Sequence, residues 1–158
     1  MSKVCLECGG EMVREVRKVP YTYSGQVIEV EQPGDWCNAC GEGVLTVADM
    51  KATELELHDF RAMIDGLLPS YEVRKIRKKL NMTQKVAAEI FGGGPNAFSR
   101  YERGEAIQMK AVDNLLRLFD KHKELVAEVQ NLAAEAKQAA IASGYQSTLC
   151  DEQEKRPS

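Results

Sequence analysis

The stretch F-G-G-G-P-N-A-F-S-R-Y-E-R-G, residues 91–104, predicts a short helix with one packed side and one polar side. Three glycines end the preceding apolar run, and Pro95 suits a first helical position because its φ is fixed and it lacks an N–H. Phe98 and Tyr101 then lie three apart on one side. The other side offers an amide, a hydroxyl and two guanidiniums, from Asn96, Ser99, Arg100 and Arg103.

This polar set is the kind that reads a DNA major groove. A guanidinium matches the O6 and N7 acceptors of guanine, and an asparagine amide matches N6 and N7 of adenine. We therefore predict base contacts by Asn96 and Arg100, and a phosphate contact by Arg103, which lies nearer the helix end. Taken singly, the arginines also fit an ordinary solvated helix face, and Asn96 fits a local hydrogen bond to the backbone.

The preceding residues complete a helix-turn-helix pattern. Ser70 can cap one helix, and Asn81 suits the left-handed position that ends it. Thr83 can cap a second helix over residues 84–91, from which the glycine turn leads to the helix at Pro95. Such a motif places its second helix in the major groove while the first crosses the backbone. The expected backbone contacts are Arg74, Lys78, Gln84, Lys85, Ser99 and Arg103.

Charge is divided sharply along the chain. Residues 1–68 hold 6 basic and 12 acidic side chains (net −6), residues 69–123 hold 12 and 6 (+6), and residues 124–158 hold 3 and 6 (−3). A basic middle between acidic flanks indicates a polyanion partner for one segment only. At 158 residues with 44% apolar content, the chain can form two small domains.

The sequence contains no run of 18 apolar residues and no apolar stretch like a signal peptide at its start. We therefore expect a cytoplasmic protein without a membrane segment. Five cysteines in such a reducing compartment argue against a disulfide framework.

Four of the cysteines form two C-x-x-C pairs, Cys5 with Cys8 and Cys37 with Cys40, and each pair is followed by glycine. Glycine lets the backbone turn tightly enough for two thiolates to face one ion. Two such knuckles give four thiolates around zinc at about 2.3 Å, a closed structural site. We predict one structural Zn²⁺ per chain. A redox dithiol is the alternative, although it needs only one pair, in a βαβ setting that is absent here.

Between the cysteine pairs, residues 11–19 and 26–31 alternate in polarity around a Ser24-Gly25 turn signal, which predicts two or three antiparallel strands. Their edges can accept a strand from a partner, or the strands can simply scaffold the metal site. Thr46, with Asp49 three residues later, predicts the start of a helix that runs to about residue 65. His58 on this helix is expected to be a surface or packing residue rather than a ligand.

The pattern breaks over residues 66–69, where we place a domain boundary. Beyond residue 104 a last helix is predicted from about Lys110, and its apolar positions continue at steps of four and three as far as Ala139. This weak heptad seam fits a dimer contact or a single amphipathic helix folded back on the domain. From Ser143 the chain turns polar, and Cys150 is predicted to be a free thiol on a disordered tail.

Together these motifs resemble the bacterial MqsA antitoxins, also called YgiT-type zinc-finger/helix-turn-helix proteins. The resemblance covers residue 4 to about residue 128. It is carried by the four cysteines, by P-Y-T-Y at 20–23, by R-K-I-R-K-K-L-N-M-T-Q-K at 74–85 and by the stretch at 91–104. It implies pairing with a neighbouring ribonuclease toxin through the zinc domain, dimerisation through the helix-turn-helix domain and repression of the protein's own promoter.

The predicted fold class is therefore α+β: a small zinc-binding N-terminal domain, then an all-α helix-turn-helix domain of XRE/Cro type with a C-terminal helical extension. Residues 1–66 are assigned to zinc and toxin binding, residues 69–123 to DNA binding, and residues 124–158 to a helical extension and tail. The resemblance places zinc on the four cysteines and base contacts on Asn96 and Arg100.

The favoured function is a non-enzymatic antitoxin and autorepressor, a homodimer that binds a palindromic operator and a small basic ribonuclease. The alternative is a zinc-containing helix-turn-helix regulator without a toxin partner. An enzyme is the third class, but the sequence offers no open-coordination ligand set, no paired catalytic carboxylates and no nucleophile with its base.

Overall fold

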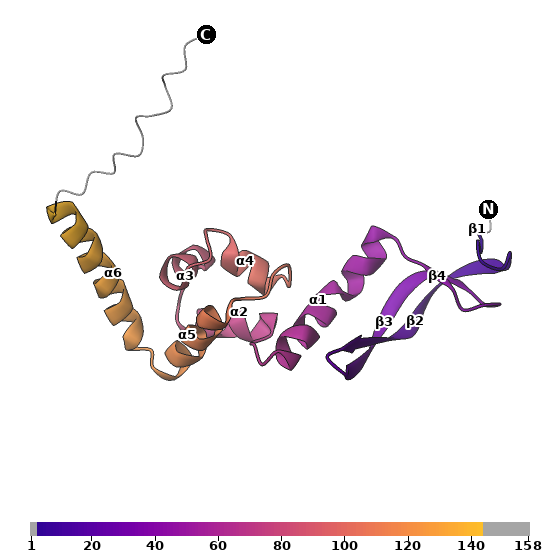
Figure 1. Ribbon diagram of the computed structural model, residues 1–158, viewed down its shortest axis with the longest axis horizontal. Coiled ribbons are helices and arrows are strands. Elements are labelled where there is room, and N and C mark those ends of the chain that lie inside the picture. The colour runs from indigo at the N-terminus through magenta and orange to yellow at the C-terminus, as the bar shows by residue number, and fades with distance from the viewer. Residues whose placement is uncertain (1–2, 144–158) are drawn as a thin grey trace, which may run out of the picture.

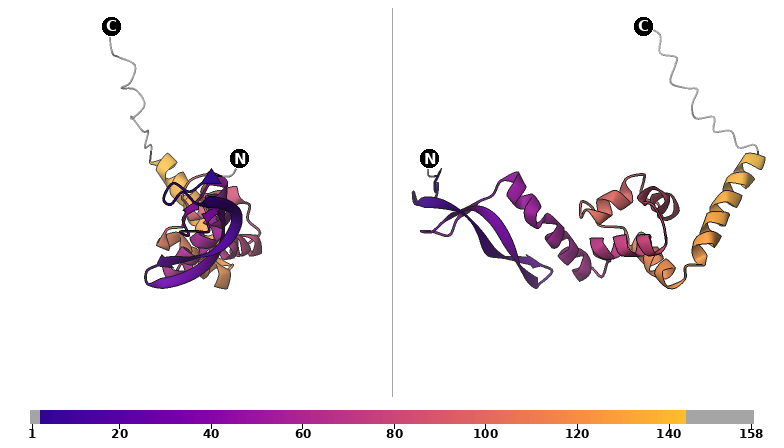
Figure 2. Two further views of the ribbon diagram at one scale, coloured as in Figure 1. Left: turned by 90° about the vertical axis from the view of Figure 1, so that its right-hand side faces the viewer. Right: turned by 180° about the vertical axis from the view of Figure 1, so that it is seen from behind.

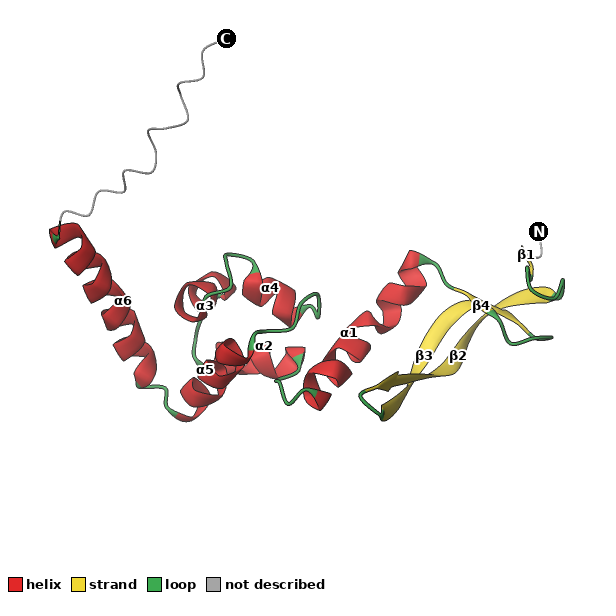
Figure 3. Ribbon diagram, viewed as in Figure 1, coloured by secondary structure: helices red, strands yellow, loops and turns green. Residues whose placement is uncertain are grey.

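The fold is elongated, with strands at one end and helices over the rest of its length (Figures 1 and 3). The computed structural model describes residues 3–143. A four-stranded antiparallel sheet is followed by one long helix, by a cluster of four shorter helices and by a last helix that projects from this cluster. This arrangement confirms the predicted α+β fold class. Within the described residues, no helix is both long enough and apolar enough to cross a bilayer.

The sheet has the order β1-β2-β3-β4 and is dominated by one long hairpin. β2 (Glu11–Tyr23) pairs with β3 (Gln26–Cys37) along its length, whereas β1 (Lys3–Val4) and β4 (Gly43–Val44) are two-residue strands. The hairpin closes at Ser24 and Gly25, whose φ values of 46° and 77° are those of a primed turn that matches strand twist. The predicted strands and turn are thus confirmed.

Helix α1 (Val47–Ile64) lies against β3, between the sheet and the helix cluster (Figure 1 and right panel of Figure 2). Its start is the predicted capping box of Thr46 and Asp49. The Arg14 guanidinium of β2 also hydrogen-bonds to both oxygens of Asp49, and this holds the pKa of Asp49 well below its usual value. The same carboxylate therefore starts α1 and ties it to the sheet.

The contact between α1 and the sheet is largely polar. Gln32 of β3 is buried and donates to the Asp49 carbonyl at 2.8 Å, while its amide oxygen accepts from Thr53 Oγ1 at 2.8 Å. In the described part of residues 1–66, the buried hydrophobic side chains are Cys5, Val30, Cys37 and Ala62.

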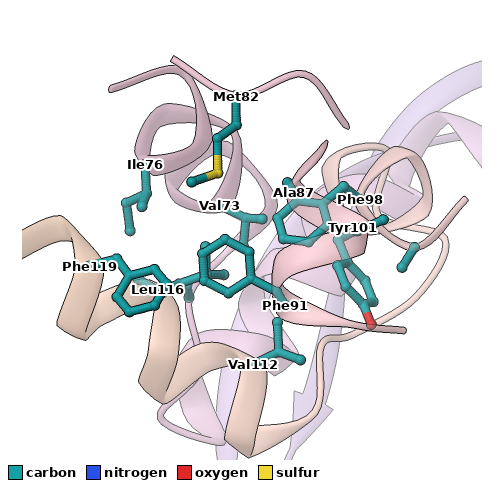
Figure 4. Close-up of a cluster of buried hydrophobic side chains, with 13 residues drawn as sticks. Val73, Ile76, Met82, Ala87, Phe91, Phe98, Tyr101, Val112, Leu116 and Phe119 are labelled. Carbon is teal, nitrogen blue, oxygen red and sulfur yellow. The ribbon is translucent and has the colours of Figure 1, made fainter. Parts of the chain in front are cut away.

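The helix cluster has an apolar core of its own (Figure 4). Its elements are α2 (Ser70–Lys79), α3 (Gln84–Phe91), α4 (Ala97–Glu102) and α5 (Lys110–Lys121). α3, the glycine turn and α4 form the predicted helix-turn-helix. The core gathers buried residues from the linker and all four helices: Leu68, Val73, Ile76, Met82, Ala87, Ala88, Phe91, Ala97, Phe98, Tyr101, Val112, Leu116 and Phe119.

The predicted helix boundaries in this cluster are partly right. Thr83 caps α3, and Asn81, with φ 56°, ends α2 in the left-handed conformation. Ser70 is not a cap, because Pro69 occupies that position and the Ser70 N–H and hydroxyl both donate to Asp59 of α1. Pro95 is not the first residue of α4, because a turn closed by the Ala97 N–H and the Gly94 carbonyl at 3.1 Å comes first.

The prediction of one continuous last helix is wrong. α5 ends at Lys121, His122 leaves the helical conformation with φ −129° and ψ 75°, and α6 (Leu125–Ala142) begins after a short turn. The break lets three apolar residues of α6 pack against the core of the helix cluster, namely Leu125, Val126 and Val129. Tertiary packing has overridden the heptad period here. The predicted tail beyond residue 143, with Cys150, lies outside the described residues.

A buried ion pair joins three elements of the cluster. The Arg77 guanidinium of α2 binds both oxygens of Glu102 on α4 and donates to the Met82 carbonyl before α3 at 2.7 Å. Gln84 of α3 donates to the same carboxylate at 2.9 Å. Burial raises the pKa of Glu102, but the hydrogen bonds from Arg77 and Gln84 outweigh burial and leave its pKa below the usual value.

We predict that Glu102→Ala lowers the free energy of unfolding by about 3 kcal/mol, because Arg77 would keep a buried charge without its partner. Urea denaturation followed by circular dichroism measures this. Glu105→Ala is the matched control, because Glu105 pairs with Arg103 at the exposed surface. Loss of this ion pair should barely change the urea concentration at the midpoint of unfolding. Similar losses in both variants would contradict the assignment.

Candidate metal centre and nucleic-acid interface

The four predicted zinc ligands converge at the sheet end of the molecule. The sulfurs of Cys5, Cys8, Cys37 and Cys40 all lie within 4.8 Å of one another. Two separations across the cluster are 3.6 Å, between Cys5 and Cys40, and 3.5 Å, between Cys8 and Cys37. Four thiolates held tetrahedrally at about 2.3 Å from one ion lie about 3.8 Å apart, so the donor set suits zinc in spacing as well as in chemistry.

The two knuckles that carry these cysteines have the same backbone geometry. In the first, the Gly9 N–H donates to the Cys5 carbonyl, and in the second the Gly41 N–H donates to the Cys37 carbonyl, both at 2.9 Å. Both glycines have positive φ, 74° and 81°, which favours residues without a side chain. A Cβ at Gly10 would lie 3.1 Å from the Cys37 sulfur and 3.3 Å from that of Cys8, so this glycine keeps the centre open.

The thiols of the cluster differ in pKa because they lie close to one another and to different N–H groups. N–H groups of Cys40 and Ala39 hydrogen-bond to the Cys37 sulfur and lower the pKa of Cys37 to about 6. At Cys40 the Glu42 N–H lowers the pKa, but the nearby thiol of Cys8 and burial raise it, and the net pKa is about 12. One thiol thus ionises easily while another resists it. A bound metal would let all four serve as thiolates, and its binding would release protons.

Helix α4 presents the predicted base-reading residues on its outer side. Asn96, at the N-cap, and Arg100 are exposed, and neither side chain hydrogen-bonds to any other described residue. The local backbone bond considered for Asn96 is therefore not made. On the inner side, Phe98 is fully buried and Tyr101 is 7% exposed, and their rings meet edge to face at 5.7 Å. The packed side fixes the direction in which the polar side points.

The predicted phosphate contacts fall into two groups. Arg74, Lys78 and Lys85 are exposed on α2 and α3, free to meet an anion. The others are engaged within the molecule: Gln84 binds Glu102, and the Arg103 guanidinium binds Ser99 Oγ at 2.7 Å and Glu105. Sequence reasoning missed the roles of Arg77 and Glu102, because no local pattern links residues 25 positions apart.

Comparisons with known proteins place these features in a family context. A family model described as the antitoxin component of a bacterial toxin-antitoxin system, MqsA, matches residues 3–130. The antitoxin MqsA of Escherichia coli (strain K12) is 41% identical over 124 residues, which cover 77% of this chain and 94% of that protein. The solved N-terminal domain of E. coli MqsA is 27% identical, with a TM-score of 0.38, and the match covers 40% of this chain and 98% of that one.

We predict that Cys37→Ser abolishes binding of one zinc per chain and unfolds the sheet, while α2–α5 stay folded because their core lies within residues 68–129. Metal content by mass spectrometry, together with amide hydrogen exchange, measures both effects. Ala39→Ser, which adds a hydroxyl to the same knuckle without removing a ligand, should keep the metal. Collapse of protection in α2–α5 along with the sheet would show that the two parts fold as one.

Proposed function

Because the chain belongs to the MqsA antitoxin family, we propose that it neutralises a ribonuclease toxin and represses its own operon as a DNA-binding dimer. An antitoxin of this family is a regulatory protein, so the prediction that the chain is not an enzyme is confirmed. In this proposal, residues 1–66 bind zinc and the toxin, and residues 69–123 bind operator DNA. Both interactions take place in the cytoplasm. Among the described residues, α6 follows residue 123 as a helical extension.

The proposed DNA-binding function depends on one observation about α4. Asn96 and Arg100 are exposed and make no side-chain hydrogen bond to another described residue, while the opposite side of the helix is buried. In this proposal α4 enters the major groove, Arg100 reads guanine and Asn96 reads adenine. A helix held by Phe98 and Tyr101 loses little freedom on binding, which favours specific contacts. A twofold dimer would set two such helices on a palindrome, with half-sites a whole number of turns apart.

Phosphate contacts would fix the register. Arg74, Lys78 and Lys85 are exposed cations that flank the reading helix on α2 and α3. Arg103 would exchange its surface partner Glu105 for a phosphate, at small cost because exposed ion pairs contribute little. Ser99 and Gln84 would follow as hydrogen-bond donors. The net charge of +6 on residues 69–123 favours this polyanion.

The toxin half of the proposal rests on the open edge of the long hairpin. On its outer side β3 pairs with β4 only at Asp35 and Trp36, so among the described strands its edge is unpaired over residues 26–34. A strand from the toxin could hydrogen-bond along this edge. Residues 1–68 carry a net charge of −6, which suits a basic ribonuclease. Beside the edge, a groove of about 520 Å³ between β3 and α1 is lined by Leu45, Val47, Met50 and Leu57.

We predict that Arg100→Ala weakens operator binding by about 1 to 3 kcal/mol and blurs one base preference, because it removes a base contact. Lys78→Ala, by contrast, should weaken operator and random DNA alike, because a phosphate contact carries no sequence information. Binding titrations on both DNAs, at one salt concentration, separate the two effects. Equal losses on operator and random DNA for Arg100→Ala would overturn its assignment as a base reader.

We predict that the product of the neighbouring gene is toxic alone, harmless beside this chain and co-purifies with it. Glu29→Lys with Glu31→Lys, on the open β3, should release the toxin and restore its toxicity. The matched control, Glu7→Lys with Glu42→Lys at the knuckles, makes the same charge change away from the edge and should retain it. If the product of the neighbouring gene is not toxic, the result would instead favour a zinc-containing regulator without a toxin partner.

A further inference from the structure

The middle of α1 packs against the turn that ends the helix proposed to read DNA. Gly104 follows α4 with φ 71° and is buried. A Cβ added there would lie 2.6 Å from Leu55 Cδ1 and 3.4 Å from both the Leu55 Cα and the His58 ring. The Leu55 side chain, the His58 ring and the backbone of α1 therefore all lie within contact distance of this turn. Residues 55 and 58 lie three apart, on one face of α1.

His58 is enclosed at this contact. It is 3% exposed, its Nδ1 lies 3.2 Å from Asp59 Oδ1, and its Nε2 is buried without a hydrogen-bond partner among the described residues. A buried imidazole nitrogen without a partner is costly, and it is tolerated where packing fixes the ring. Of the two roles predicted for His58, surface or packing, this position fits packing, but no sequence pattern indicates that the ring packs between two units.

Asp59, the next residue, caps a helix of the other unit. Its Oδ1 accepts the Ser70 N–H at 2.7 Å and its Oδ2 accepts the Ser70 hydroxyl at 2.9 Å. Pro69 at the N-cap has no side-chain group to do this, so α2 is capped from α1. The linker is pinned as well: Leu68 donates its N–H to Asp113 at 2.7 Å and accepts from Gln108 at 2.7 Å.

A short path runs from this contact to the base-reading residue. The Gly104 N–H donates to the Tyr101 carbonyl at 3.2 Å, and the Glu105 N–H donates to the Arg100 carbonyl at 2.9 Å. These two bonds close the last turn of α4 in the pattern that a left-handed residue allows. A shift of α1 that moves Gly104 would therefore act on the turn that carries Arg100.

We infer that Leu55, His58 and Asp59 are positioning residues for DNA reading: they dock α1 on the turn after α4 and hold the reading helix in its pose. The inference rests on the proposed DNA-binding function. If α1 holds the reading helix in its pose, the orientation of the metal- and toxin-binding unit affects operator recognition. A partner that moves α1 away from Gly104 would then change the position of Arg100 without contacting DNA.

The test uses a matched pair of glycines in the full zinc-loaded chain. Gly104 and Gly66 both end helices with left-handed φ, 71° and 70°, but a Cβ at Gly66 would meet nothing within 4 Å. Both alanine variants therefore carry the same backbone strain, and only Gly104→Ala also pushes on α1. The readout is labelling of histidine by diethyl pyrocarbonate, which attacks exposed rings. The half-exposed His122 serves as the internal standard.

In the wild-type chain His58 should react far more slowly than His122. Gly104→Ala should speed labelling of His58 about tenfold, the effect of a 1.4 kcal/mol change in docking, and reduce the preference for operator over random DNA, whereas Gly66→Ala should do neither. Leu55→Ala alone removes a side chain that docks α1, so it should speed labelling of His58 and reduce the preference for operator DNA in the same direction as Gly104→Ala. If Gly104→Ala does not fold, Leu55→Glu replaces it, with Met50→Glu as control.

Equal labelling of His58 and His122 in the wild type would overturn the docking. An exposed His58 with undiminished operator preference in Gly104→Ala, or a protected His58 with diminished preference, would overturn the positioning role while leaving the DNA function intact. Failure of the wild-type chain to bind any operator would overturn the DNA function and the positioning role together, and the labelling would still report whether α1 is docked.

Discussion

The four thiols at the sheet end are the constraint on which the N-terminal part of this protein depends. Across residues 3–66 very few hydrocarbon side chains are buried, and two of the four buried hydrophobic residues are cysteines of the cluster. What remains is polar: the Arg14–Asp49 pair and the amide of Gln32. A sheet of this size with one covering helix gains too little from apolar burial alone. Metal binding at the four cysteines would supply the missing free energy, because the site exists only in the folded chain.

The helix cluster is stabilised by apolar burial instead of by a metal site. Thirteen buried residues form one apolar core, and α4, only six residues long, contributes three of them. So short a helix has little stability of its own, and it stays formed because Phe98 and Tyr101 pack inward while Glu102 is held by Arg77. The apolar core beneath the groups proposed to read DNA would therefore survive loss of the metal. The proposed toxin edge and the α1 contact with Gly104, by contrast, belong to the metal-binding unit.

Local signals predicted the local features. The capping box at Thr46, the turn at Ser24-Gly25 and the left-handed Asn81 each follow from a few neighbouring residues, and each was found. The failures have a common cause, which is contact between distant parts of the chain. Ser70 does not cap α2, because its hydroxyl donates to Asp59 of α1. The predicted last helix is interrupted at His122, and Leu125 packs against the core beyond this break. At the candidate sites, the cysteine spacing predicted the cluster, but it carried no sign of the docked α1 or of the Glu102 network.

Helix α6 buries none of its 18 residues, and seven of them are alanine. Its helicity thus comes mainly from intrinsic propensity, and most substitutions along its far half cost nothing in packing. It extends about 27 Å from the break near His122, away from both the metal centre and α4 (Figure 1). This makes its end a natural attachment point: a fluorophore, affinity tag or surface tether joined there would report on the molecule while keeping clear of both proposed binding faces.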